Sequence, residues 1–159
     1  QDFVAATGGI YLALDGVQDP QNLGAICRSA LGLGVKGIFL PQKDSAPAGG
    51  TAMKASAGTL MEMPLCFTGS IASLMQFVSD KNPDIAMIAL DKSGELFSAA
   101  DLDFAKAGYP TLLVVGSEQG ISRLALERAT HRRRLRISDS VESYNVSVAT
   151  ALALYCLTQ

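Results

Sequence analysis

The stretch "LLVVGSEQGIS" (residues 112–122) reveals most about the fold, because an apolar run gives way at once to a glycine-rich segment. The run shows no alternation of polar and apolar residues, which is typical of a strand buried on both faces of a parallel sheet. It ends at Gly116, and Glu118 lies between two glycines. Ligands bind such sheets at the carboxyl ends of the strands. The stretch therefore indicates a ligand-binding turn or, as the simpler alternative, an ordinary strand-to-helix turn with a solvated Glu118.

Similar apolar runs recur along the chain and alternate with helical patterns. We predict strands over residues 10–15, 37–41, 64–67, 85–90, 111–116 and 134–138. We predict helices over 19–34, 51–63 (weakened by Gly58), 70–81 (capped by Ser70), 122–132 and 145–157. Residues 42–50 and most of 92–110 are expected to be connections. Continuous apolar strands separated by helices predict an α/β fold, with a mostly parallel sheet covered by helices on both faces.

The composition is that of one domain with a sizeable core. The 159 residues are 48% hydrophobic and 18% charged, which predicts extensive burial or an apolar surface covered by a partner subunit. No apolar run is long enough to span a membrane, and no segment resembles a signal peptide. Three distant cysteines and a single histidine lead us to expect no disulfide framework and no metal site. Reduced cysteines favour a cytoplasmic protein.

Charge is distributed unevenly along the sequence. The formal net charge of −2 argues against a protein that binds nucleic acid over its whole surface. Six of the seven arginines nevertheless lie between residues 123 and 136. This cluster indicates either a local basic patch for a nucleic acid or a solvated helix end, where cations are favoured near the C-terminus.

The segment "DPQNLGAICRSA" (residues 19–30) carries polar groups that a helix start does not need. Asp19 and Pro20 are explained as a cap and a first helical residue. Asn22 and Arg28 have no such explanation. Six residues of helix place their side chains roughly 240° apart, at about 100° per residue. The two side chains therefore need not serve one ligand from the same side.

The segment "LRISDSVESYNVS" (residues 135–147) also carries more polar side chains than a helix start needs. Ser143 or Asn145 could cap the apolar helix that follows. One cap uses one side chain, whereas residues 142–145 are all polar. A functional site at the start of this helix is the alternative interpretation.

Together these segments resemble the SpoU (TrmH-like) branch of the SPOUT methyltransferases, and the resemblance covers nearly the whole chain. The family's first motif, Asn followed by Gly-Ala and Arg, is similar to "NLGAICR" (22–28). Its second motif, Gly-x-Glu-x-x-Gly after a strand, is approximated by "VGSEQGIS" (115–122). Its third motif, Ile-Pro-Met followed by Ser-Leu-Asn-Val-Ser, is approximated by "LRI" (135–137) and "SYNVS" (143–147). The segment "KASAGTLMEMP" (54–64) also looks like the family's Ala-Ser-Ala-Gly. Bacterial 23S ribosomal-RNA methyltransferases of the guanosine-2′-O type are the most similar group.

The resemblance implies an α/β fold with a deep C-terminal trefoil knot, contrary to the general rule that chains are unknotted. Family members bind S-adenosylmethionine in the knot loops, act as homodimers and methylate a ribose 2′-hydroxyl of RNA. Residues 1–159 would be the catalytic domain, without the N-terminal RNA-binding domain that many members carry. Ribosomal RNA would be the main partner and transfer RNA the alternative, with no membrane and no metal involved.

Positions in the motifs carry the family's functional residues onto this chain. The resemblance implies catalytic roles for Arg28, Asn22, Glu118, Ser143 and Asn145. It implies binding of S-adenosylmethionine by Leu90, Gly116, Gly120, Leu135, Ile137, Tyr144, Asn145 and Val146. The chain departs from the family pattern at Arg136 and Ile137, which replace Pro and Met, at Tyr144, which replaces Leu, and at Gln119, which replaces Gly.

Two alternatives stand beside an RNA 2′-O-methyltransferase. One is a knotted RNA-binding module that has lost catalysis, which the altered "LRI" segment suggests, and the other is a SPOUT enzyme that methylates a base. Within the family, the arginine of the first motif is proposed as the base. A guanidinium stays protonated in proteins, so we expect Arg28 to hold a phosphate and to stabilise a developing alkoxide instead.

Overall fold

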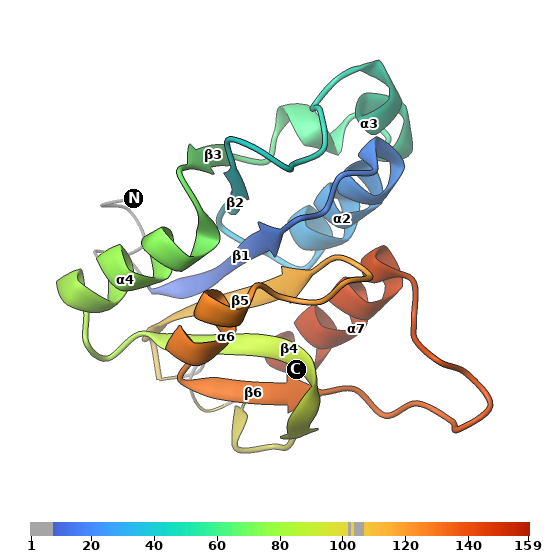
Figure 1. The fold of residues 1–159 in the computed structure, drawn as a ribbon. Coiled ribbons are helices and arrows are strands. Elements are labelled where there is room, and N and C mark those ends of the chain that lie inside the picture. Colours follow the sequence, from blue (N-terminus) through green and yellow to red (C-terminus); the bar gives the residue numbers. More distant parts are fainter. Residues whose placement is uncertain (1–7, 102, 104–106) are drawn as a thin grey trace.

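The structure is a computed structural model that describes residues 8–101, 103 and 107–159. Six strands form one sheet in the order β3-β2-β1-β5-β4-β6, and all their pairings are parallel (Figure 1). The strands are β1 (Gly9–Asp15), β2 (Ile38–Pro41), β3 (Leu65–Thr68), β4 (Ala86–Leu96), β5 (Pro110–Gly116) and β6 (His131–Arg134). The prediction of a mostly parallel α/β sheet is confirmed.

Helices cover both faces of this sheet, as predicted. They are α2 (Pro20–Gly32), α3 (Gly50–Ala55), the 3₁₀ helix η1 (Thr59–Met61), α4 (Ile71–Lys81), α6 (Arg123–Arg128) and α7 (Val146–Thr158). One core cluster joins α2 and α7 to the sheet through residues such as Ile26 and Leu154. A second cluster joins α4 and α6 to the opposite face through Leu74 and Ala125. The trefoil knot that the resemblance implies stays a prediction.

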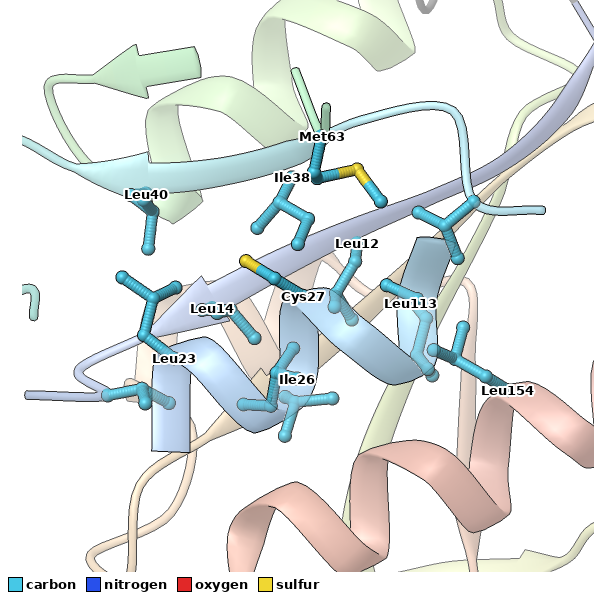
Figure 2. Packing of buried hydrophobic residues seen from close by; sticks show 14 of the residues in the cluster. Leu12, Leu14, Leu23, Ile26, Cys27, Ile38, Leu40, Met63, Leu113 and Leu154 are labelled. Carbon is cyan, nitrogen blue, oxygen red and sulfur yellow. The ribbon is translucent and has the colours of Figure 1, made fainter. Parts of the chain in front are cut away.

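The larger cluster lies between β1, α2 and α7 (Figure 2). Leu12, Leu14, Leu23 and Leu154 are all fully buried there. Burial of one such side chain contributes about 1.5–3 kcal/mol relative to exposure. Burial also raises the pKa of the Cys27 thiol to about 11. The thiol therefore stays protonated near neutral pH and packs as a small apolar group.

Two helix starts follow directly from the sequence. The Asp19 carboxylate accepts a hydrogen bond from the backbone N–H of Gln21 at 2.9 Å and caps α2. The Ser70 hydroxyl accepts from the backbone N–H of Ser73 at 3.0 Å, and the Ser73 hydroxyl accepts from the N–H of Ser70 at 3.1 Å. This reciprocal pair satisfies two backbone donors that a helix start leaves unpaired. The prediction of Ser70 as the cap is confirmed.

The segment packed beside α2 is less regular than predicted. The helix expected over 51–63 ends at Ala55, and a 3₁₀ turn follows Gly58, whose φ of +86° favours glycine. Gly24 of α2 allows this segment to approach closely. A Cβ built on Gly24 would lie 2.3 Å from the carbonyl oxygen of Ala52. The α2 and α3 backbones therefore contact each other where a side chain would hold them apart.

The predictions for residues 122–138 were partly wrong. The expected helix over 122–132 ends at Arg128, and the expected strand over 134–138 pairs over His131–Arg134 instead. Thr130 explains the change, because its hydroxyl accepts from the N–H of Met87 at 2.8 Å and donates to the Met87 carbonyl at 3.0 Å. These bonds fix Thr130 to β4, so residues beyond Arg128 cannot continue the helix.

The strand β4 extends beyond its predicted range of 85–90. It continues to Leu96 after an irregularity between Leu90 and Glu95, so part of the expected connection over 92–110 is a strand. Gly94 permits this second pairing with β6. A Cβ at Gly94 would lie 2.5 Å from the carbonyl carbon of Arg132. The two backbones pass too closely here for any side chain.

Candidate active site

The order in which the strands follow one another reverses between the neighbouring strands β1 and β5. From β1 the strands proceed outward through β2 to β3, whereas β5, β4 and β6 lie on the other side of β1. Asp15 at the end of β1 pairs with Gly116 at the end of β5. Loops that leave two such neighbouring ends diverge, and ligands of open α/β sheets bind in the crevice between them.

A cavity of about 240 Å³ lies at this crevice. Its wall is formed by the loop after β1, the first turn of α2, the loop after β5 and the first residue of α7. The lining residues are Gly16, Val17, Gln18, Asp19, Asn22, Ser117, Glu118, Gln119 and Val146. Three residues predicted for the site, Asn22, Glu118 and Val146, therefore come together from distant parts of the sequence.

The loop after β5 is a tight turn that only glycine permits at two positions. The N–H of Gly120 donates to the Ser117 carbonyl at 2.8 Å, and the φ of Gly120 is +87°. A Cβ built on Gly116 would lie 2.4 Å from the carbonyl carbon of Gly120. Gly116 and Gly120, both predicted to bind the cofactor, thus shape the turn. The turn places Glu118 in the cavity wall with its side chain exposed.

Asp15 contributes to the site although it was not among the predicted residues. Its carboxylate oxygen Oδ2 accepts a hydrogen bond from the N–H of Ser122 at 2.8 Å. This bond joins the end of β1 to the last part of the turn that carries Glu118. Its place at the carboxyl end of a buried strand is the signal that could have pointed to this residue in the sequence.

Asn145 connects the last helix to the cavity wall. Its Oδ1 accepts from the N–H of Ser147 at 2.9 Å, which caps α7. Its Nδ2 donates to Oδ1 of Asn22 at 3.2 Å. Two predicted catalytic residues are therefore in contact, and the same side chain performs the capping that the sequence offered as an alternative. The capping interpretation of Asn145 is confirmed, whereas its role in a functional site stays a prediction.

The segment between β6 and α7 carries most of the remaining predicted cofactor residues. The Tyr144 hydroxyl donates to the carbonyl of Arg136 at 2.7 Å and closes this loop on itself. Leu135 and Val146, together with Leu90 of β4, are partly buried against the α2 and α7 core. Ile137 is half-buried. Half-buried apolar side chains beside the strand ends suit the faces of a flat heterocyclic ligand.

Arg28 and Ser143 lie outside the cavity. Arg28 is exposed and follows Gly24 by four residues, which places it on the α3 side of α2 rather than with Asn22. Within residues 8–101, 103 and 107–159, Arg28 forms no ion pair. A broad open depression of about 1030 Å³ lies on that side, lined by Gln21, Gly50, Thr51, Met53, Lys54 and Ala55. It contains none of the predicted site residues.

An ion pair fixes β6 to the turn after β4. Arg133 Nε donates to Oδ1 of Asp101 at 2.8 Å, and the Asp101 side chain is 1% exposed. The N–H of Ser98 donates to the other carboxylate oxygen at 2.7 Å. Burial, and then the positive charge of Arg133, lower the pKa of His131, while Asp101 acts in the opposite sense. His131 is therefore neutral at neutral pH and adds no charge to β6.

Neither a metal centre nor a membrane segment is found in the described part of the chain. No three of its histidine, cysteine and acidic side chains are grouped so that they could hold an ion. No helix there has the length and apolarity that crossing a bilayer requires.

Comparisons with known proteins agree with this fold. The model of the SpoU rRNA Methylase family matches residues 9–155. The 23S rRNA (guanosine-2′-O-)-methyltransferase RlmB of Pseudomonas aeruginosa is 35% identical over 147 residues, which are 92% of this chain and 57% of that protein. A solved structure of a TrmH-family protein from Porphyromonas gingivalis is similar with a TM-score of 0.83 at 30% identity, over 96% of this chain and 60% of that one.

The fold likeness extends to more distant structures. The SpoU methyltransferase AviRb from Streptomyces viridochromogenes, solved with AdoMet, has a TM-score of 0.82 at 24% identity, over 99% of this chain and 62% of that one. The chain spans about half to three fifths of the length of the curated relatives it matches. The family match runs from β1 into α7 and includes all three motifs. This chain belongs to the SpoU rRNA methylase family.

Proposed function

We propose that residues 1–159 form the catalytic domain of an S-adenosylmethionine-dependent RNA methyltransferase that acts on a ribose 2′-hydroxyl. The observation that carries this proposal is the arrangement of Asn22, Glu118 and Asn145 around one crevice in a chain of this family. A relative similar over most of the chain is named a 23S rRNA (guanosine-2′-O-)-methyltransferase. Ribosomal RNA is therefore the substrate we propose, with transfer RNA second because another relative is named a tRNA/rRNA methyltransferase.

The residues at the crevice fit S-adenosylmethionine. The adenine base needs apolar contacts, and Leu90, Leu135 and Val146 are half-buried near the carboxyl ends of the strands. The ribose and the methionyl part need donors and acceptors, which the backbone of the turn at Gly116–Gly120 can supply. AviRb, which has the same fold, was solved with this cofactor. When bound, the cofactor supplies a methyl group activated by its sulfonium.

The side chains of this chain can position the acceptor ribose. In-line displacement requires the hydroxyl opposite the sulfur, and positioning contributes about 7–11 kcal/mol to such reactions. The Nδ2 group of Asn22 makes no hydrogen bond within the described residues and can donate to a ribose oxygen. Glu118 can accept from a ribose hydroxyl. Arg28, exposed outside the cavity, can hold a phosphate of the bound RNA through its guanidinium group.

We also propose that the protein acts as a homodimer through α7. Val148, Leu152 and Tyr155 are 47%, 40% and 60% exposed. Their spacing of four and three residues places them on one side of the helix. Large contiguous apolar patches on soluble proteins mark interaction surfaces. A second copy of the chain, as the family resemblance implies, would cover this side of α7.

The proposed site of action is the cytoplasm. Cys27, Cys66 and Cys156 are free thiols, which is usual in a reducing compartment. An RNA substrate favours the same location.

Replacement of Arg28 by alanine tests the catalytic proposal. We expect transfer of labelled methyl groups to ribosomal RNA to fall about 10²-fold, because loss of the phosphate contact would misplace the acceptor ribose. Binding of S-adenosylmethionine, measured by calorimetry, should not change because Arg28 does not line the cavity. Lys54→Ala on neighbouring α3 is the matched control and should keep full activity. Full activity of Arg28→Ala would contradict the assignment.

Two other results would favour the alternatives. A folded chain that binds RNA without a calorimetric signal for S-adenosylmethionine would be a knotted RNA-binding module, which Arg136 and Ile137 in the third motif suggest. Methylation on a base would instead identify a base-modifying enzyme. Mass spectrometry of the modified nucleoside separates ribose from base methylation.

A further inference from the structure

Exposure alternates along residues 131–138 at every second position. His131, Arg133, Leu135 and Ile137 are half-buried, while Arg132, Arg134, Arg136 and Ser138 are exposed. Successive side chains of an extended segment point to opposite sides. Arg132 and Arg134 are therefore on one side of β6, about 7 Å apart, and Arg136 continues the same alternation after the strand ends. We call these three arginines the row.

Other arginines of this region are already engaged, and the three in the row are not. Arg133 is bound to buried Asp101, and Arg123 forms a salt bridge with Glu127 at 3.0 Å. Arg128 donates to the carbonyl of Ala72. Neither Arg132, Arg134 nor Arg136 has a carboxylate partner among the residues described by the structure. On a chain with a net charge of −2, this row is a local concentration of uncompensated positive charge.

The row leads to the edge of the sheet at which the candidate active site lies. β6 is the last strand of the sheet, and its carboxyl end points to the same edge as those of β1 and β5 (Figure 1). Only β4 separates β6 from β5, so the two strands are about 10 Å apart at a spacing of about 4.8 Å per strand. The Tyr144 hydroxyl holds the backbone of Arg136 at the start of the loop that returns to Asn145.

We propose that Arg132, Arg134 and Arg136 form a phosphate-binding row that holds the RNA backbone beside the cavity. The choice of RNA as the partner rests on the proposed function. Guanidinium groups bind phosphate with two parallel hydrogen bonds, and Arg is favoured over Lys where planar recognition matters. A backbone held there would leave the target nucleotide free to enter the crevice between the ends of β5 and β1, which lie about 10 and about 14 Å from β6 at this strand spacing.

A different role for the same charges gives a different experimental result. Charged side chains on an edge strand prevent pairing with other chains, and charges of either sign serve that purpose. Binding of phosphate requires positive charge. Reversal of the charge therefore separates the two roles, because it keeps the protection of the edge and removes the attraction for RNA.

The test compares two double variants with the same change of net charge. Arg132→Glu with Arg134→Glu alters the row. Lys36→Glu with Lys81→Glu alters two exposed cations that precede β2 and β4, near the amino ends of the strands. Affinity for a fluorescein-labelled oligouridylate is measured as a function of salt concentration. We expect the row variant to bind the oligouridylate roughly 10–100-fold more weakly at low salt. The slope of log K against log[salt] should become shallower by about 1.4, because each of two lost phosphate contacts on a single strand contributes about 0.7. The lysine variant should bind as the parent does.

Several results would overturn the proposal. An unchanged affinity and slope in the row variant, with a normal thermal melt, would show that the charges only protect the edge. An equal loss in both variants would show a general effect of net charge. With methylation as a second readout, the row variant should raise the KM for ribosomal RNA and keep kcat. A parent chain that binds oligouridylate through the row and never methylates RNA would contradict the proposed function alone.

Discussion

Asn145 shows how one side chain can serve both the stability of the fold and the site. Its oxygen caps α7, and its NH₂ group donates to Asn22, which lines the cavity. Removal of the whole side chain would therefore affect stability and site together. An experiment on Asn145 has to keep one function while it alters the other.

Asn145→Asp makes this separation. Aspartate caps helices as well as asparagine does, so the free energy of unfolding should change little. The new carboxylate has no NH₂ group, and Asn22 would have to rotate its own NH₂ group toward it and away from the cavity. We expect methyl transfer to fall at least tenfold.

Denaturant unfolding and a transfer assay on the same sample check this prediction. Asn145→Ala is the comparison, because it removes the cap and should cost about 1 kcal/mol of stability as well. An Asn145→Asp protein with full activity would show that the contact with Asn22 does not serve the reaction.

At the scale of the element, segments with strong local signals were predicted well. The start of α4 at Ser70, the start of α2 after Asp19 and the buried strand β5 all carry their signal in adjacent residues. The edge strand β6 was misplaced because its sequence, His-Arg-Arg-Arg, contains no apolar residue and does not resemble a buried strand. The extension of β4 was missed because Gly94 matters only through its contact with Arg132, which the local sequence does not contain.

Two glycines of the same helix give opposite predictions. Gly24→Ala should destabilise the fold by about 1–3 kcal/mol, because its Cβ would meet the carbonyl of Ala52 and force α2 and α3 apart. Gly32→Ala at the end of the helix meets nothing within 4 Å and should stabilise by up to about 1 kcal/mol through the entropy of the unfolded chain.

Urea unfolding of the two single variants and the parent provides the measurement. The pair controls for helix propensity, since both changes replace glycine by alanine in α2. If the two substitutions changed the free energy of unfolding equally, the contact between α2 and α3 would not restrict the size of the side chain at position 24.

At the scale of the whole molecule, strand order decides which residues meet. The sequence indicated a parallel α/β sheet, yet nothing local in it places β5 beside β1. That neighbourhood brings Asp15 to Ser122 and Asn22 to Asn145, contacts across 107 and 123 residues. Resemblance to a family supplied the motif residues, but Asp15 lies outside the motifs and was found only through the fold.

The exposed side of α7 carries the prediction for assembly. Leu152→Glu should convert the proposed dimer to a monomer, because a charge would be buried without a partner between two copies. Light scattering after size-exclusion chromatography measures the mass. Leu124→Glu, on exposed α6 at the other face of the sheet, is the matched control and should leave the mass unchanged. A dimeric Leu152→Glu protein would exclude α7 as the interface.

The strand order also has an evolutionary consequence. The strands β1 to β3 form one contiguous half of the sheet and β4 to β6 the other, and only the β1–β5 ladder joins them within the sheet. The cavity lies on this seam. Along the seam, a substitution in one half changes the surroundings of a residue in the other, as with Asn22 and Asn145. Among homologues, covariation should therefore concentrate at the seam, while the outer strands diverge independently.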